Sequence, residues 1–227
     1  MSKKFILIFA GGEKDLSKDE FQGALSEHNI NSESALSIIA ADSGGDFAVS
    51  CGVTPDLLIG DLDSISHENL ESLSNNQKTI IEKHNQDKLE TDLELALNKA
   101  ISHSPESIFI FGAFGGRLDH ELANISLCAD GDYEGSRIVL IGKDQCGYVL
   151  QNESSVTISG ELGQVFSLIP LSDEVSGVSI LGSRWELKDV VLKSGKSRSV
   201  CNEFLGGDVV VSVGVGKVFV IVSGRNA

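Results

Sequence analysis

PDLLIGDLDSIS, at residues 55–66, is the most informative segment of this 227-residue chain. Its apolar run ends at Gly60, and Asp61 and Asp63 follow two residues apart. In an open α/β sheet, ligands bind outside the carboxyl ends of the strands, where these carboxylates would project. Two carboxylates this close repel each other unless a cation or a proton lies between them, so a hard divalent ion is their natural partner. A turn followed by a helix cap at Asp63 or Ser64 is the simpler alternative.

Short apolar runs recur through the first two thirds of the chain. They are FILIFA (5–10), LSIIAA (36–41), DLLIG (56–60), TIIEK (79–83), SIFIFG (107–112) and RIVLIG (137–142). Helical spacing of apolar residues predicts a helix over 91–103 and another from about 117 to 128, the second with Leu118, Leu122 and Ile125 on its core face. Strands that alternate with helices favour a parallel sheet covered by helices.

After about residue 145 the helical periodicity disappears. Val- and Ile-rich runs such as SVTIS (155–159) and KVFVIVS (217–223) are separated by Gly and Ser, which is typical of antiparallel strands. The sequence therefore predicts an N-terminal open, mainly parallel α/β sheet domain over 1–144, followed by a C-terminal antiparallel β-sandwich over 145–227.

Composition excludes several classes of function. The formal net charge of −15 repels nucleic acid and anionic membranes, so an anionic substrate would need metal ions as intermediaries. The four cysteines form no CxxC pair, which argues against a zinc site or a dense disulfide framework. The apolar run at 5–10 is too short for a signal peptide or a membrane span, so we expect a cytoplasmic protein.

A second acidic group lies in QDKLETD (86–92), where Asp92 opens the predicted helix after Asp87 and Lys88. Helix chemistry alone would also explain this pattern. Thr91 and Glu94 have the spacing of a capping box, and an aspartate is favourable near the positive end of a helix dipole.

The third segment is FGAFGGRLDHELAN (111–124). Glycines such as Gly116 let a backbone approach a phosphate, a helix N-terminus offers free N–H groups, and Arg117 adds a bidentate donor, which together predict an anion site. A flexible strand-to-helix turn with a surface pair between Arg117 and Asp119 is the alternative. The single tryptophan, Trp185, is either a buried core residue or an exposed face for a flat cationic ring.

Taken in order, these segments resemble the thiamine pyrophosphokinase family. The matching segments are DSGGD (42–46), GVTPDLLIGDLDS (52–64), TD (91–92), GGRLDHELAN (115–124), FSLIPLS (166–172), GSRWEL (182–187) and SRSVCNEF (197–204). The resemblance implies a two-domain homodimer that transfers the pyrophosphoryl group of ATP to thiamine, giving thiamine diphosphate and AMP. It also implies an α/β domain that holds ATP and Mg²⁺, and a β-sandwich that completes the thiamine pocket at the subunit interface.

The resemblance also implies roles for individual residues. Asp61, Asp63 and Asp92 match the aspartates that surround the metal and the phosphates, and Arg117 and Asp119 would line the same site. The residues expected to contact ATP or thiamine are Asp42, Gly60, Asp87, Lys88, Thr91, Gly116, Trp185, Ser199 and Asn202.

The chain departs from the family pattern at two positions. Leu89 stands where many members have an aspartate, so that Asp87 would supply that carboxylate or the ligand set would be smaller. Cys201 stands where a serine is common.

Two alternatives from other classes remain open at this point. The first is a phosphatase of the haloacid dehalogenase type, with Asp61 as nucleophile and Asp63 as acid, although its motif usually follows the first strand. The second is a non-catalytic nucleotide sensor.

Overall fold

The computed structural model describes residues 4–224 of the chain, which form two compact units. The first unit contains the described residues up to Leu127 together with Leu140–Lys143. The second contains Cys128–Val139 and the described residues from Asp144 onward. The predicted boundary between residues 144 and 145 stays a prediction.

Five parallel strands form the sheet of the first unit, and the apolar runs of the sequence account for each of them. They are β1 (Phe5–Phe9), β2 (Ser37–Ala41), β3 (Leu57–Gly60), β4 (Ile80–Lys83) and β5 (Ser107–Phe111). Their order is β5-β1-β2-β3-β4, and every adjacent pair is parallel. The chain thus starts in β1, runs outward to β4 and returns to the other side of β1. The predicted α/β class is confirmed.

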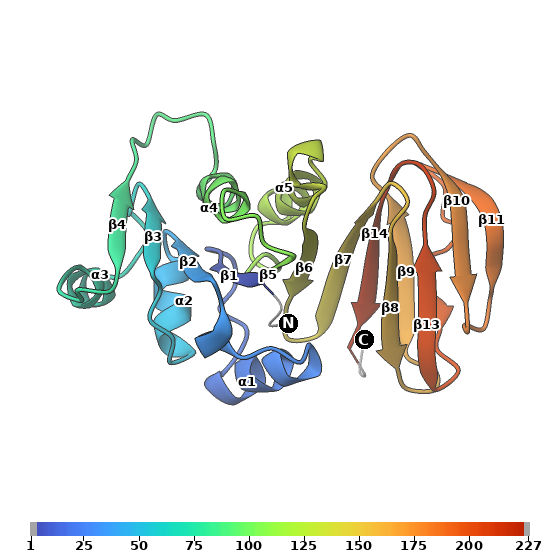
Figure 1. The fold of residues 1–227 in the computed structure, drawn as a ribbon, viewed down its shortest axis with the longest axis horizontal. Helices are drawn as coiled ribbons and strands as arrows, with labels where there is room; N and C mark the ends of the chain where they lie inside the picture. The colour runs from blue at the N-terminus through green and yellow to red at the C-terminus, as the bar shows by residue number, and fades with distance from the viewer. Residues whose placement is uncertain (1–3, 225–227) are drawn as a thin grey trace. The chain divides into compact units, whose positions relative to one another are not determined.

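Helices cover both faces of this sheet, with α4 and α5 on one side and α1 and α2 on the other (Figure 1). Their bounds are α1 (Lys18–Glu27), α2 (Gly44–Ser50), α3 (His67–Ser74), α4 (Asp92–Ile101) and α5 (Leu118–Cys128). Short 3₁₀ turns lie at Ser32–Ser34 and Gly131–Tyr133. None of the helices of residues 4–224 combines the length and apolarity that a membrane span requires.

The two predicted helices have different outcomes. In α4, Leu93, Ala96 and Leu97 are buried as the apolar stripe predicts, and the Thr91 hydroxyl accepts the N-terminal cap bond from the Glu94 N–H. The core face predicted for α5 is wrong at Leu118, which is 66% exposed, and at Leu122, which is 57% exposed, whereas Ile125 is partly buried.

The side chain of Asn124 connects α5 to the loop after β5, because its amide donates to the carbonyl oxygen of Ala113 at 3.1 Å. The Asn124 face thus lies toward the loop after β5, and Leu118 and Leu122 remain on the exposed side.

The second unit is a sandwich of two antiparallel sheets. Its strands are β7 (Gln145–Gln151), β8 (Ser155–Gly160), β9 (Val165–Pro170), β10 (Glu174–Leu181), β11 (Leu187–Lys193), β12 (Asn202–Glu203), β13 (Gly207–Ser212) and β14 (Lys217–Ser223). The order β12-β9-β14-β7 is this unit's part of a ten-stranded sheet, and the other sheet has the order β11-β10-β13-β8. β6 (Arg137–Ile141) precedes β7 and lies where the chain passes between the two units.

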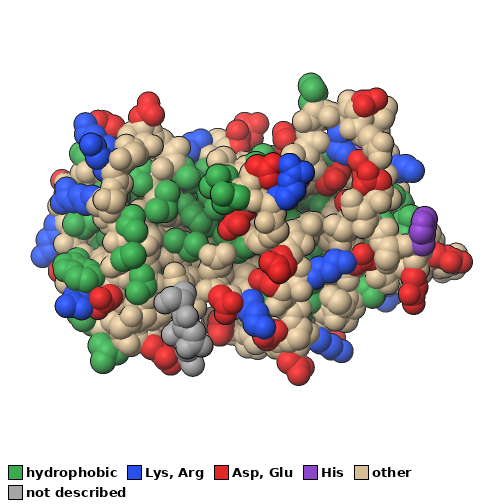
Figure 2. All heavy atoms as spheres, turned by 180° about the vertical axis from the view of Figure 1, so that it is seen from behind, with side chains coloured by type: hydrophobic (Ala, Val, Ile, Leu, Met, Phe, Trp, Pro, Cys, Tyr) green, Lys and Arg blue, Asp and Glu red, His purple; other side chains and the backbone are tan. Residues whose placement is uncertain are grey.

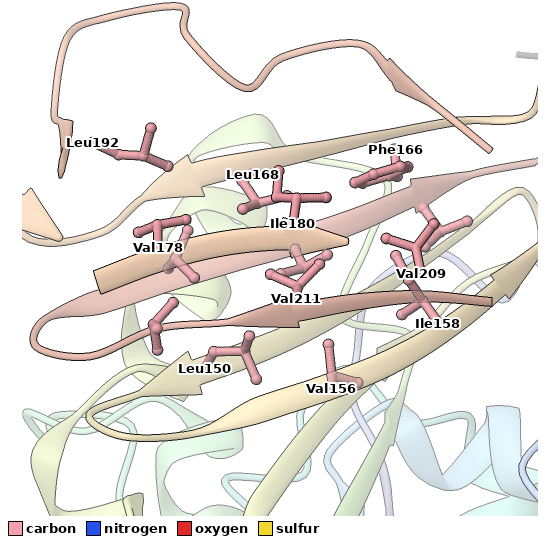
Figure 3. Packing of buried hydrophobic residues seen from close by; sticks show 14 of the residues in the cluster. Leu150, Val156, Ile158, Phe166, Leu168, Val178, Ile180, Leu192, Val209 and Val211 are labelled. Carbon is pink, nitrogen blue, oxygen red and sulfur yellow. The ribbon is translucent and has the colours of Figure 1, made fainter. Parts of the chain in front are cut away.

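A single hydrophobic cluster fills the space between the two sheets of the sandwich (Figure 3). Leu168 of one sheet and Val211 of the other are both fully buried within it. The rings of Phe166 and Phe204 lie 4.9 Å apart between centroids and are also fully buried. The predicted β-sandwich is therefore confirmed.

Phe166→Ala should destabilise the second unit by about 3–5 kcal/mol, because it removes a fully buried ring and leaves a cavity beside Phe204. Urea unfolding followed by the fluorescence of Trp185, the only tryptophan, measures the free energy of unfolding of this unit. Leu205→Ala is the control because Leu205 is 58% exposed, and it should change that free energy by less than about 0.5 kcal/mol. Equal losses in both variants would contradict the assigned core.

Candidate active site

The carboxyl ends of β1 to β5 meet at one edge of the sheet, because all five strands are parallel. Asp42 directly follows β2, and Asp61 and Asp63 directly follow β3, its neighbour. Carboxylate oxygens of these three residues lie within 4.8 Å of one another, and we refer to the three as the acidic cluster. The structure thus brings Asp61 and Asp63 together at the ligand-binding edge and adds Asp42 to them.

Unusual backbone conformations hold the acidic cluster in place. Asp42 has φ 46°, Leu62 has φ 62° and Gly60 has φ 144°. Residues other than glycine rarely adopt positive φ angles of this kind. The Asp42 N–H donates to the carbonyl oxygen of Ile59 at 2.9 Å, and the Ser64 N–H donates to Asp42 Oδ1 at 3.3 Å. The end of β2 is thereby bonded to β3 and to Ser64 in the loop that follows β3, residues 61–66, which we call the acidic loop.

Asp92 joins this site from the first residue of α4. A methyl group on Gly60 would lie 2.8 Å from Asp92 Oδ1, so the carboxylate packs directly on the main chain at the end of β3. The Lys88 ammonium lies 2.9 Å from Asp92 Oδ1 and 3.8 Å from Asp61 Oδ2. Gly60 is therefore required by close approach as well as by its φ angle.

The electrostatics of the site suit a bound cation. Burial raises the pKa of Asp42, and the charge of Asp92 raises that pKa further. Asp92 Oδ1 is buried, and its one ion-pair contact among the described residues is with the Lys88 ammonium at 2.9 Å. A hard divalent ion binds carboxylate oxygens. It would favour the ionised form of Asp42 and give the buried oxygen of Asp92 a positive partner, so these residues fit Mg²⁺.

Glycine-rich loops occupy the neighbouring part of the same edge, after β1 and β5. The strand order reverses between these two strands, and ligands bind at such a switch point in open α/β sheets. The Gly12 N–H donates to the Gly112 carbonyl at 2.9 Å, so the two loops are hydrogen-bonded to each other. Gly115 and Gly116 follow with φ 80° and 78°. The sequence pointed to the second loop, whereas the loop after β1 was missed although its Gly11–Gly12 pair ends an apolar run.

Arg117 and Asp119 form a bidentate ion pair at the start of α5. Arg117 donates from Nε to Asp119 Oδ1 at 3.1 Å and from Nη2 to Oδ2 at 2.6 Å. The two side chains are 74% and 62% exposed. The pair agrees with the surface-pair alternative, and the predicted roles of Arg117 and Asp119 at the phosphates stay predictions.

Two side chains of the segment before α4, those of Gln86 and Lys88, contact the carboxylates of the site. Gln86 donates from Nε2 to Asp63 Oδ2 at 2.8 Å, and Lys88 reaches Asp61 and Asp92. Asp87 is exposed, and its carboxylate is not among those of the acidic cluster. The role predicted for Asp87 therefore stays a prediction.

Asp46 is a structurally important residue that the sequence analysis missed. Its carboxylate accepts hydrogen bonds from Lys14 Nζ at 2.9 Å, from the Ser66 hydroxyl at 2.7 Å and from the Asn69 amide at 2.8 Å. Burial raises its pKa, but the bonds from Ser66, Asn69 and Lys14 outweigh burial and lower the pKa to about 2. Asp46 thus fastens the loop after β1 and the end of the acidic loop to α2. The sequence signal for it was the second acid of DSGGD.

In the second unit, Trp185 is half exposed, as the ring-stacking alternative requires. Asn202 is buried and holds the Trp185 main chain, accepting from its N–H at 3.2 Å and donating to its carbonyl at 2.8 Å. The Arg184 guanidinium lies 4.7 Å from the Trp185 ring centroid and pairs with Glu203 at 2.6 Å. Ser199 has φ 77° and donates its hydroxyl to the Leu168 carbonyl at 3.1 Å. The amide of Asn202 is therefore already engaged within the protein.

An open parallel sheet with carboxylates and glycine-rich loops at its ligand-binding edge is typical of enzymes that act on phosphorylated substrates. Residues 28–140 match the family described as thiamin pyrophosphokinase, catalytic domain. Residues 150–218 match the family described as thiamin pyrophosphokinase, vitamin B1 binding domain.

Individual relatives agree with the two family matches. The thiamine pyrophosphokinase of Bacillus subtilis is 29% identical over 202 residues, which cover 89% of this chain and 90% of the relative. Thiamine pyrophosphokinase 1 of Oryza sativa is 33% identical over 158 residues, covering 65% of this chain and 58% of the relative. The crystal structure of the Bacillus subtilis protein superimposes with a TM-score of 0.80 at 27% identity, over 98% of this chain and all of the other.

The chain belongs to the thiamine pyrophosphokinase family, whose members are ATP-dependent pyrophosphotransferases. The comparisons give no support to the phosphatase or to the nucleotide sensor.

Asp46→Asn should make the free energy of unfolding of the first unit less dependent on pH in the acidic range. The pKa of Asp46 lies at about 2 in the folded protein against 3.8 for an ordinary aspartate. Its ionisation therefore stabilises the fold above pH 4, and this contribution is lost as the pH falls from about 4 toward 2. Denaturant titrations should find the variant less stable by about 2 kcal/mol at pH 7, with the difference shrinking toward pH 2. A difference that is constant with pH would contradict this assignment.

Proposed function

We propose that this chain transfers the pyrophosphoryl group of ATP to the hydroxyl of thiamine, and that Asp61, Asp63 and Asp92 carry the reaction by holding Mg²⁺. The observation on which the proposal rests is the convergence of the acidic cluster and Asp92 on one sheet edge. The thiamine hydroxyl attacks the β-phosphorus of ATP and AMP leaves, without a covalent enzyme intermediate.

Alignment and charge neutralisation dominate such a transfer, so the protein needs no nucleophile of its own. A bound magnesium ion supplies charge neutralisation to the phosphates. Arg117 exchanges its pairing with Asp119 for the developing phosphate charge, and a carboxylate of the acidic cluster accepts the hydroxyl proton. The remaining residues proposed to contact the nucleotide are Asp42, Gly60, Asp87, Lys88, Thr91 and Gly116.

For thiamine we propose a site in the second unit, centred on Trp185. The match of residues 150–218 to a vitamin B1 binding domain supports this assignment, as does the half-exposed indole. The ring stacks on the cationic thiazolium, while Ser199 and Asn202 shape the surrounding loop. Residues 1–144 would then form the catalytic domain and residues 145–227 the thiamine-binding domain.

The proposal includes a homodimer in the cytoplasm. Most of the exposed large hydrophobic side chains among residues 4–224 belong to the second unit, and many apolar side chains are visible at the surface in Figure 2. Such exposure is typical of a surface that another protein covers. Sedimentation velocity across a concentration series tests the assembly, and a monomer at all concentrations would argue against it.

Asp61→Asn and Asp63→Asn should each lower kcat/KM by at least about 100-fold, because each removes a charged ligand from the metal site. The assay mixes enzyme, Mg²⁺, ATP and thiamine and separates the nucleotide and thiamine products. AMP and thiamine diphosphate are expected, and ADP with thiamine monophosphate would overturn the proposed site of attack. The control is Asp19→Asn, since Asp19 lies on the exposed side of α1. It should retain normal activity.

Trp185→Ala should raise the KM for thiamine about tenfold and leave the KM for ATP within a factor of two, because it removes only the stacking surface. In the unaltered chain, thiamine should change the fluorescence of Trp185, the only tryptophan, with the same concentration dependence as turnover. Val191→Ala, at another exposed apolar position of the second unit, is the control. A Trp185→Ala variant with a normal KM for thiamine would exclude the stacking role.

A further inference from the structure

Lys88 is a lysine whose charged end is turned into the protein. Its side chain is only 12% exposed, whereas its chain neighbours Asp87, Leu89 and Glu90 are all exposed. Lysines are rarely buried unless they are paired with opposite charge. The Lys88 stem therefore points inward because of what its ammonium meets there, and packing of the neighbouring residues does not explain it.

The Lys88 ammonium contacts two of the carboxylates that we propose as metal ligands. It lies 2.9 Å from Asp92 Oδ1, which is buried and otherwise without a hydrogen bond, and 3.8 Å from Asp61 Oδ2. Asp92, Asp61 and Asp42 together favour the charged form and raise the pKa of Lys88, although burial opposes them. The ammonium thus already occupies a position that a divalent ion bound to Asp61 and Asp92 would need.

We propose that Lys88 is a built-in competitor of free divalent cations at this site, and that it makes the enzyme prefer metal already bound to nucleotide. A divalent ion without nucleotide must displace the ammonium from two carboxylates and leaves it without an acceptor. A metal–nucleotide complex brings phosphate oxygens to which Lys88 can turn, so the displacement is compensated. The inference rests on the proposed function, because it takes Asp61 and Asp92 as metal ligands.

The segment that carries Lys88 supports such an exchange. Gln86, two residues earlier, is exposed and donates to Asp63 Oδ2 at 2.8 Å. Gln86 and Lys88 therefore both contact carboxylates of the site, Gln86 at Asp63 and Lys88 at Asp61 and Asp92. Leu89, between Lys88 and α4, is 99% exposed and does not anchor the segment by packing. Lys88 is thus free to move its long side chain without disturbing a core.

The test measures Mn²⁺ binding without nucleotide, by titrating the free-ion electron paramagnetic resonance signal, which requires no activity. Lys88→Gln should bind Mn²⁺ about tenfold more tightly than the unaltered chain, because it removes the competing charge. Lys88→Arg keeps the charge and should bind Mn²⁺ like the unaltered chain. Lys78→Gln removes an exposed lysine elsewhere in the first unit and should change the affinity less than twofold.

In turnover, the concentration of Mg–ATP at half-saturation should move the other way in Lys88→Gln, rising about tenfold. Unchanged or weaker Mn²⁺ binding in Lys88→Gln, with a native circular dichroism spectrum, would overturn the inference. Asp61→Asn separates it from the proposed function: this variant should lose Mn²⁺ affinity. Undiminished Mn²⁺ binding in Asp61→Asn would mean that the metal binds elsewhere, and both proposals would fall. If Asp61→Asn behaves as expected and only Lys88→Gln fails, the competitor role alone is wrong.

Discussion

Repulsion among carboxylates gathered at one sheet edge is the constraint on which the first unit depends. Asp42, Asp61 and Asp63 have oxygens within 4.8 Å of one another, and Asp92 packs on the adjoining backbone. Like charges at such distances destabilise a folded chain unless a cation lies among them. The fold must therefore impose these positions, and the φ angles of Asp42 and Leu62 show that it does so at some strain.

The acidic loop is fixed at both ends before any ligand binds. At its start, Gly60 closes β3 within the parallel sheet, and its missing side chain admits Asp92. At its end, Ser66 caps α3 and is bonded to the buried Asp46. The residues between Gly60 and Ser66 are therefore anchored at both ends, which preorganises their carboxylates for a cation. This arrangement also explains why Asp46 pairs with Lys14: the loop after β1 is fastened to the same point.

The parts of the fold that were predictable from sequence are those governed by local pattern. Apolar runs predicted the five parallel strands, the change of period predicted the sandwich, and the Thr91 cap predicted where α4 begins. The exposed side of α5 was not predictable, because the spacing of Leu118 and Leu122 does not show whether another element covers them. At the site, strand-end chemistry located Asp61 and Asp63.

Residues whose role depends on tertiary contact were harder to assign. Asp46 accepts hydrogen bonds from Ser66 and Asn69 only because α2 and α3 meet in the fold. No apolar periodicity or capping pattern in the sequence places these partners beside it. Asn202 was expected to contact thiamine, yet its amide groups bind the main chain of Trp185. Its effect on a ligand would therefore be exerted through the position of Trp185.

That arrangement bears on how an aromatic ring in an acidic protein could select a cation. Arg184 already stacks on Trp185, and a second positive charge near the ring would weaken the attraction for a cationic ligand. Glu203 removes this difficulty, because it pairs with Arg184 at 2.6 Å and neutralises it. The guanidinium then contributes packing that steadies the indole, while the net charge beside the ring stays near zero. Trp185 is thus held by Asn202 through its main chain and by a neutral ion pair through its ring, and its exposed surface would be open to the proposed ligand.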